Sequence, residues 1–242
     1  MGDASTSTPE NLTERGAIQL FLQRYRYFLF AGLVVFIDQA VKIAIKFSMI
    51  PYENIAVVGD TVNINFIENK GAAFGLTVAD LLQRIGVNVE DDTAKLVLTL
   101  FSLLAVMLIA YFLQAVRNAK SGLPYFLALI LGGAIGNIID RVFYGVWFSG
   151  INDYEGGLLH GRVVDMFYVN LVHGKFLGME MNLLPVFNIA DAAITIGIIA
   201  IILFQRRFFK KAADEQEEQS SAALAETSGN PVVSEQGLGA GE

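Results

Sequence analysis

LILGGAIGNIIDRVFYGV, residues 129–146, is apolar enough to enter a lipid bilayer, yet it carries Asn137, Asp140 and Arg141. Charged and amide side chains are costly at bilayer depth. They are kept there when they are paired, placed at an interface or lining a wet cavity. The stretch therefore predicts a membrane-spanning helix whose polar end belongs to a structural or functional site.

Two further stretches carry carboxylates beside apolar sequence. GRVVDM, residues 161–166, contains Asp165, and FNIADAAITIG, residues 187–197, opens a second apolar run with Asn188 and Asp191. Asp140, Asp165 and Asp191 are thus expected at the rim of the membrane. The rest of the chain is expected to be a scaffold that brings them together.

Composition places the chain among membrane proteins. Hydrophobic residues make up 54% of its 242 residues and charged residues only 17%, which is unusual for a soluble domain. The net charge of −7 comes from the end of the chain, since residues 212–242 hold seven acidic residues and no Lys or Arg. No basic patch points to nucleic acid as a partner.

Residue types exclude several kinds of chemistry. The chain has no cysteine, so disulfides and thiol chemistry are excluded. Its two histidines, His160 and His173, form no HExxH motif, so a zinc protease is not expected. The sequence predicts neither a metal site nor another cofactor.

Four apolar runs have the length of about 20 residues that is needed to cross ~30 Å of hydrocarbon. They predict an all-α membrane protein with four transmembrane helices, at residues 27–47, 96–116, 124–143 and 187–204. A polar segment, residues 1–26, precedes this four-helix domain of residues 27–211. An acidic, disordered tail is expected over residues 212–242.

Cations flank the apolar runs on one side of the predicted membrane. Because Lys and Arg are enriched in cytoplasmic loops, both termini are expected in the cytoplasm. The loops of residues 48–95 and 144–186, with all three rim aspartates, are then expected on the outer side of the membrane. The cations are Arg24, Arg26, Arg117, Lys120, Arg206, Arg207, Lys210 and Lys211.

The first outer loop predicts a small β element. Residues 55–66, IAVVGDTVNINF, are rich in β-branched residues and contain a turn signal at residues 59–60, a pattern typical of a hairpin. Asn69 and Gly71 then end the strand. A short sheet beside the carboxylates could hold an extended peptide by main-chain pairing. A simple turn before an interfacial segment fits the same residues.

Two of the rim aspartates are candidates for paired acid–base chemistry. Two carboxyl groups close together in a low-dielectric site do not both ionise easily, so one holds a proton while the other acts as a base. This arrangement activates water in aspartic proteases. Asp165 with Asp191 is the favoured pair, because Asp140 precedes Arg141 directly and fits a structural role at a helix end. The residues alone leave the other pairings open.

Some polar residues have simpler explanations. Asp38 and Lys42 are spaced i, i+4 in the first span and predict a buried ion pair on one helix face. A Ser–Lys protease using Ser48 with Lys42 or Lys46 has no supporting pattern. A small transporter or proton-relay protein would also carry intramembrane acids. Here, however, the acids gather at one rim and no inverted repeat is visible.

Five short motifs follow one another along residues 38–191. They are D-Q-x-x-K at 38–42, N-x-G-A-A-F at 69–74, G-N-x-x-D-R at 136–141, V-V-D-M at 163–166 and F-N-x-A-D at 187–191. In these motifs, in their order and in the four-span frame, the chain resembles the lipoprotein signal peptidase (signal peptidase II) family of bacteria.

The resemblance implies that Asp165 and Asp191 are the catalytic pair of a membrane aspartic endopeptidase. It implies an enzyme of the bacterial inner membrane, in contact with membrane lipids and using no cofactor, and we expect this enzyme to be a monomer. The implied substrate is a prolipoprotein that carries diacylglycerol on a cysteine and is cut on the N-terminal side of that cysteine. The residues implied to bind the substrate or to support the pair are Asn69, Gly71, Ala72, Gly136, Asn137, Asp140, Arg141 and Asn188.

Inserts distinguish this chain from many members of the family. Many members join the D-R and V-V-D motifs by a few residues, whereas 23 residues separate Arg141 from Asp165 here. Further inserts lie at residues 77–94 and 169–185, a pattern that suggests a Bacteroidetes-type member. None of the inserts removes a motif residue, so they leave the expected reaction unchanged and bear on the shape of the site's mouth.

Overall fold

Four long helices make up most of the protein. The computed structural model describes residues 9–59, 61–71, 79, 82–83, 86, 88–119, 121–170, 173–176, 179–182 and 185–228. The long helices are α1 (Pro9–Ser48), α3 (Asp91–Val116), α4 (Leu123–Ile139) and α6 (Ile189–Ser228). Each contributes a stretch long and apolar enough to cross a membrane: Gly16–Ser48, Asp92–Val116, Leu123–Trp147 and Ile189–Phe208. The predicted four-span helical fold is confirmed.

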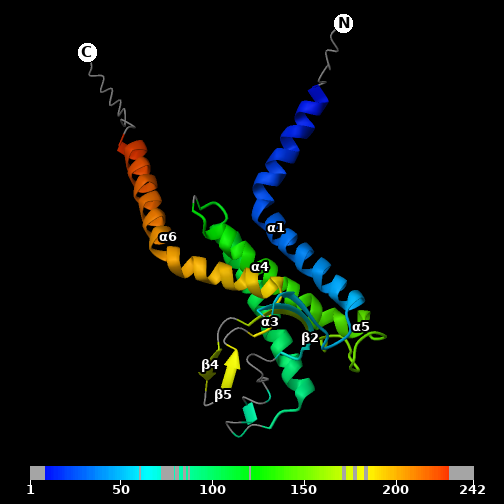
Figure 1. The fold of residues 1–242 in the computed structure, drawn as a ribbon. Helices are drawn as coiled ribbons and strands as arrows, with labels where there is room; N and C mark the ends of the chain where they lie inside the picture. Colours follow the sequence, from blue (N-terminus) through cyan, green and yellow to red (C-terminus); the bar gives the residue numbers. More distant parts are fainter. Residues whose placement is uncertain are drawn as a thin grey trace, which may run out of the picture.

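Helix α4 lies in the middle and packs against α1, α3 and α6. Figure 1 shows that α1 begins and α6 ends at one end of the bundle, whereas the strands gather at the opposite end. Large apolar side chains point outward from the spans, as Phe36, Phe101 and Leu203 show with exposed fractions of 70%, 69% and 70%. Such apolar exposure along the helices suits contact with lipid.

Glycines of α4 allow its neighbours to approach closely. A Cβ atom on Gly132 would lie 2.7 Å from the carbonyl oxygen of Ala31 on α1. A Cβ atom on Gly133 would collide with the carbonyl oxygen of Ala190 on α6. Small residues at such positions let helix backbones pack tightly in a membrane, so α4 holds the first and last spans close on either side.

A three-stranded antiparallel sheet lies at one end of the bundle. Its strands are β1 (Asn54–Val58), β2 (Val62–Asn69) and β3 (Val163–Val169), in that order. The β1–β2 hairpin follows the prediction, whereas β3 comes from a distant segment that the sequence did not predict to be a strand. Side chains of the sheet, of the residue after α1 and of the short helical turns after α4 form one apolar cluster: Met49, Phe66, Tyr144, Phe148, Val164 and Met166.

Two of the inserts have structure of their own. The insert at residues 169–185 contains a second hairpin, β4 (His173–Phe176) with β5 (Met179–Asn182). The insert at residues 144–162 begins with a short helix, α5 (Gly145–Trp147), which follows a π-helical turn, η1 (Asp140–Tyr144), at the end of α4. Part of the insert at residues 77–94 lies outside the described residues, and its last residues belong to the start of α3.

The π-helical turn is completed by the insert that follows it. A wider helical turn changes the usual backbone pairing, and here Leu159 N donates to the carbonyl of Val142 at 3.0 Å, and Gly161 N to that of Arg141 at 2.8 Å. A Cβ atom on Gly161 would collide with the carbonyl oxygen of Asp140. The insert therefore lies directly on the polar end of the third span.

Both ends of the described chain are more helical than the sequence predicts. Helix α1 begins at Pro9, inside the segment expected to be polar and irregular, and α6 continues to Ser228, where a disordered tail was expected over residues 212–242. Ala, Glu, Gln and Lys are common in residues 209–228 and have high helix propensity. This local preference extends α6 beyond its apolar part.

Candidate active site

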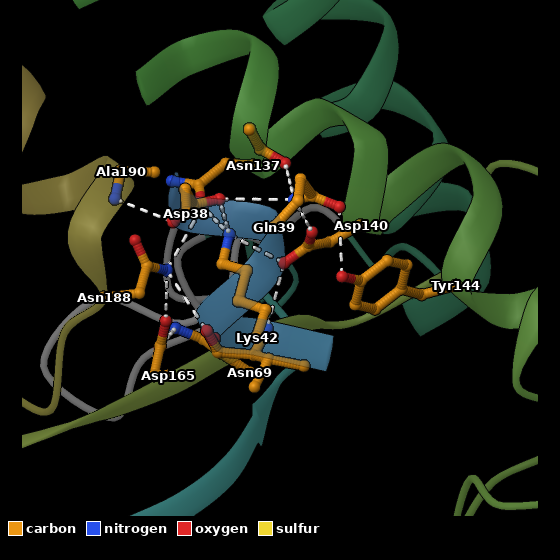
Figure 2. A network of polar contacts seen from close by, with 12 residues as sticks. Asp38, Gln39, Lys42, Asn69, Asn137, Asp140, Tyr144, Asp165, Asn188 and Ala190 are labelled. Carbon is orange, nitrogen blue, oxygen red and sulfur yellow. Dashed lines mark hydrogen bonds and ion pairs between the residues drawn. The ribbon is translucent and has the colours of Figure 1, made fainter. Parts of the chain in front are cut away.

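Asp165 and Asp191 reach the same site from two elements. Asp165 lies within β3 and is 3% exposed, whereas Asp191 lies in the first turn of α6 and is partly exposed. Figure 2 shows the surrounding network, in which Asn69, Asn137 and Asn188 lie among the buried charged groups. Each of the three asparagines contacts at least one of the two aspartates.

Asn188 contacts both aspartates. Its Nδ2 donates to Oδ1 of Asp165 at 2.7 Å, and its Oδ1 accepts from the backbone N–H of Asp191 at 2.8 Å. The backbone N–H of Asn188 donates in return to Oδ2 of Asp191 at 3.2 Å. This reciprocal pattern over four residues is a capping box at the start of α6. The F-N-x-A-D motif thus caps the start of α6 and also supplies two residues of the site.

Asn69 holds the other oxygen of Asp165. Its Nδ2 donates to Oδ2 of Asp165 at 2.9 Å, while its Oδ1 accepts from the backbone N–H of Gly71 at 2.9 Å. Gly71 has a φ of +94°, a conformation that residues with a side chain rarely adopt. A Cβ atom there would also lie 2.5 Å from Leu98 Cδ2. The Asn-x-Gly turn therefore orients the Asn69 amide. Ala72, also predicted to belong to the site, lies outside the described residues.

Burial controls the protonation of Asp165. The pKa of Asp165 is raised from 3.8 to about 7, chiefly by removal from water and in addition by the nearby charge of Asp191. The amides of Asn69 and Asn188 and the charge of Lys42 lower this pKa without cancelling the effect of burial. Asp165 is thus partly protonated near neutral pH.

A buried ion cluster lies behind the two aspartates. Lys42 Nζ lies 2.9 Å from Asp38 Oδ2 and 2.8 Å from Asp140 Oδ2, and all three side chains are fully buried. The same nitrogen donates to Oδ1 of Asn137 at 2.9 Å, and Nδ2 of Asn137 donates to Oδ1 of Asp191 at 2.8 Å. The expected Asp38–Lys42 pair is therefore part of a larger cluster that reaches Asp191 through one amide.

Asp38 also joins the first span to the last. Its Oδ1 accepts from the backbone N–H of Ala190, in the first turn of α6, at 2.9 Å. Gly136 on α4 leaves the space for this contact, since a Cβ atom there would lie 2.6 Å from Asp38 Oδ2. The first turn of a helix has N–H groups without helical partners, and here one of them is satisfied by a carboxylate of α1.

Asp140 and Arg141 point to different partners. Asp140 accepts from Lys42, from Gln39 Nε2 at 2.8 Å and from the backbone N–H of Val164 at 3.2 Å, which joins the end of α4 to β3. Arg141 Nη1 donates to Ser102 Oγ on α3 at 2.8 Å. Within the described residues, Arg141 has no carboxylate at ion-pair distance.

The network also includes Gln39 and Tyr144, which were not among the site residues predicted from the sequence. Gln39 donates to Asp140 and to the carbonyl of Gly136, and Tyr144 donates from its hydroxyl to Gln39 Oε1 at 3.0 Å. Gln39 belongs to the D-Q-x-x-K motif, which was a signal for it. Tyr144, the last residue of η1, is fully buried and had no sequence signal. Among the described residues, no group of three His, Asp or Glu is arranged to hold a metal ion.

The fold and site together define a multi-pass membrane enzyme with the paired carboxyl groups of an aspartic peptidase. A sequence model described as signal peptidase (SPase) II matches residues 30–207. The chain belongs to the signal peptidase II family. This membership does not favour the transporter interpretation.

Named relatives and a solved structure agree with this family. The chain is 37% identical over 191 residues to a lipoprotein signal peptidase of Porphyromonas gingivalis, covering 70% of this chain and 78% of that protein. It is 34% identical over 181 residues to one of Pelodictyon phaeoclathratiforme, covering 74% and 89%. A solved bacterial membrane enzyme matches 75% of this chain and 88% of its own, with a TM-score of 0.50 and 27% identity.

Proposed function

We propose that this protein removes the signal peptide from bacterial prolipoproteins that carry diacylglycerol on a cysteine, cutting N-terminal to that cysteine. Family membership and the name of the relatives support this substrate class. The observation that carries the catalytic assignment is the contact of Asn188 with both Asp165 and Asp191. One residue thus holds both carboxyl groups, that of Asp165 through its side-chain amide and that of Asp191 through its backbone N–H, which fits the shared acid–base work of an aspartic peptidase.

Their surroundings suggest which of the two acts as the base. Asp191 accepts N–H groups of Asn137 and Asn188 and lies in the first turn of α6. Hydrogen-bond donors and a helix N-terminus both stabilise a carboxylate. Asp165 is more deeply buried and its pKa is raised to about 7. We therefore assign Asp191 as the base and Asp165 as the protonated partner.

The reaction follows from these two states. Asp191 takes a proton from a water molecule, and the water oxygen attacks the scissile carbonyl carbon while Asp165 donates its proton to the carbonyl oxygen. In the resulting diol, the C–N bond breaks as Asp191 passes its proton to the leaving amine. One hydroxyl proton returns to Asp165 as the new carboxylic acid forms. Both aspartates end in their starting states.

The cations of the sequence support a location for the site. The start of α1, the α3–α4 connection and the region after the apolar part of α6 carry Lys and Arg, which favours the cytoplasm for these segments. The sheet, at the opposite end of the bundle in Figure 1, then faces the periplasm. We propose an inner-membrane protein with both termini in the cytoplasm, active as a monomer at the periplasmic face.

Cleavage by the purified full-length chain tests this function. Asp165→Asn and Asp191→Asn should each abolish cleavage of a lipidated prolipoprotein while the protein still purifies normally, because Asn keeps the shape and cannot exchange the proton. Asp140→Asn should instead reduce the yield of folded protein, since it weakens the ion cluster. Wild-type turnover by either dyad variant would refute the catalytic assignment.

The lipid on the substrate provides a second arm of this test. A substrate that starts in the bilayer gains little from burying its acyl chains, so the lipid should act by setting the depth and orientation of the scissile bond. The same prolipoprotein without its lipid should be cut at least about tenfold more slowly in equal detergent. Equal cleavage rates for the lipidated and unlipidated substrates would be consistent with a membrane peptidase but would contradict specificity for lipoproteins.

A further inference from the structure

A second buried lysine has no part in the mechanism above. Lys46 lies one helical turn beyond Lys42 on α1 and is 3% exposed. Its Nζ forms an ion pair with Glu68 and donates to Asn152 Oδ1 at 2.7 Å. Three aromatic rings, of Phe148, Phe66 and Tyr144, have their centroids 5.1, 5.5 and 6.0 Å from the ammonium nitrogen. Ring faces attract a cation at such distances.

Its partner Glu68 directly precedes Asn69 at the end of β2. Successive side chains of a strand point to opposite faces. Glu68 accordingly meets α1 through Lys46, whereas Asn69 meets Asp165. Glu68 is also opposite Val164 in the β2–β3 ladder, directly before Asp165. The ion pair thus lies behind the part of the sheet that carries one catalytic aspartate and its amide partner.

Asn152 extends the contact to the insert and the end of α4. Its Nδ2 donates to the backbone carbonyl of Tyr144 at 3.0 Å. The Tyr144 hydroxyl donates to Gln39, which in turn donates to Asp140. Lys46 therefore contacts β2 on one side and the insert on the other, and both routes lead to the catalytic network.

The energetics of this pair argue for a geometric role. Burial raises the pKa of the Glu68 carboxyl group, while Lys46 lowers it, so the pair is held at a desolvation cost. Apolar residues of similar volume often stabilise a protein as well as a buried ion pair does. Unlike an apolar pair, the ion pair fixes the distance between one residue of α1, Lys46, and one residue of β2, Glu68.

We propose that Lys46 and Glu68 are positioning residues, which fix the end of β2 on α1 and thereby set the Asn69 amide against Asp165. The effect on cleavage rests on the function proposed above. The alternative is that the pair contributes to folding stability alone. The two roles predict different results when an apolar pair replaces the ion pair and restores folding stability. A positioning role predicts a lower kcat and a shifted pH profile, whereas a purely stabilising role predicts wild-type values.

The decisive variant replaces both partners, Lys46→Met with Glu68→Leu, in the full-length protein. We expect it to fold, because no single buried charge is left behind. Its kcat should fall about tenfold to a hundredfold with little change in KM, since a displacement of ~1 Å at a reacting group costs on this scale. The alkaline limb of its pH profile should also move to higher pH, because a displaced Asn69 no longer lowers the pKa of Asp165.

Two further variants complete the experiment. Glu68→Gln keeps the shape and an acceptor for Lys46, and it should show a smaller change in the same direction even if the double variant does not accumulate. Lys95→Met removes the partly exposed Lys95–Asp92 pair of α3 and should leave kcat and the pH profile unchanged. Wild-type kcat and pH profile in the double variant, or in Glu68→Gln where the double variant is lost, would overturn the proposal.

A measurement that needs no substrate cleavage tests the positioning role independently of the proposed function. Infrared titration of the carboxyl band that is lost in Asp165→Asn reports the protonation of Asp165 directly. A higher titration midpoint in the double variant than in the wild type supports positioning even if no substrate is cleaved. An unchanged midpoint contradicts it, whatever the outcome of the cleavage assay.

Discussion

Asn137 and Asp191, 54 residues apart in the chain, are joined by a 2.8 Å hydrogen bond from Nδ2 to Oδ1. The other end of the Asn137 amide accepts from Lys42. An amide side chain can accept from a cation and donate to a carboxylate at once. The buried ion cluster of α1 and α4 therefore acts on Asp191 through one side chain of α4.

Lys42→Met should destabilise the protein strongly. It leaves the carboxyl groups of Asp38 and Asp140 buried without their cation, and breaking a buried ion pair on one side costs about 3–5 kcal/mol. Unfolding in detergent, followed by circular dichroism, measures the loss. Lys95→Met is the matched control, because a pair with an exposed partner contributes only about 0–1 kcal/mol. Equal stability of the two variants would contradict the structural role of the cluster.

The cleavage rate should fall as the pH rises through about 7. Burial raises the pKa of Asp165 from 3.8 to about 7, so the protonated form required by the mechanism is present below that pH and is lost above it. The contribution of the protonated Asp165 carboxyl group to folding stability is also lost as the pH rises through about 7. A kcat profile that stays flat from pH 6 to about 9 would exclude Asp165 as the protonated partner.

Asn69→Ala should move this alkaline limb to higher pH. The Asn69 amide lowers the pKa of Asp165, so its removal favours the protonated carboxyl group. The maximal rate should fall as well, because Asp165 loses one of its two amide contacts. The measurement is kcat against pH for both proteins, and a limb at unchanged or lower pH would contradict the assigned contact.

Gly161→Ala should prevent normal folding. The added Cβ atom would meet the carbonyl oxygen of Asp140, and Gly161 N already donates to Arg141 in the same turn. Overpacking commonly costs about 1–3 kcal/mol, and it costs more where only backbone can yield. The yield of monodisperse protein and its melting temperature measure the effect. Gly150→Ala, where nothing lies within 4 Å, should behave as the wild type.

The proposed orientation has its own test. The chain has no cysteine, so Ser149→Cys introduces a single thiol at an exposed position of the insert. A membrane-impermeant reagent should label it from the periplasm, and a reporter fused after Glu242 should be active in the cytoplasm. An external C-terminus would overturn the orientation and the periplasmic location of the site.

The sequence was informative where the physical signal is local. Span length and the β1–β2 turn depend on residues within one element, so they can be recognised without a structure. Strand β3 pairs with β2 about a hundred residues earlier, and its apolar run around Asp165 suits a membrane rim equally well. No local pattern could show that this run completes a sheet.

The contacts around the ion cluster were less predictable. The i, i+4 spacing of Asp38 and Lys42 predicts a pair, but not that Asp140 of another helix joins it. Lys46 meets Glu68 only because α1 and the sheet pack together, and Arg141 reaches Ser102 only because α3 lies beside α4. These contacts depend on tertiary packing, which one sequence does not reveal.

The contact between Asp38 and the backbone of Ala190 has a consequence for biogenesis. The two residues are 152 positions apart, and the ribosome releases the last span long after the first has entered the bilayer. The start of α6, with Asp191, cannot take its final place until it meets the carboxylate of the first span. Under the proposed catalytic role of Asp191, hydrolytic competence is therefore acquired only when the last span is in place.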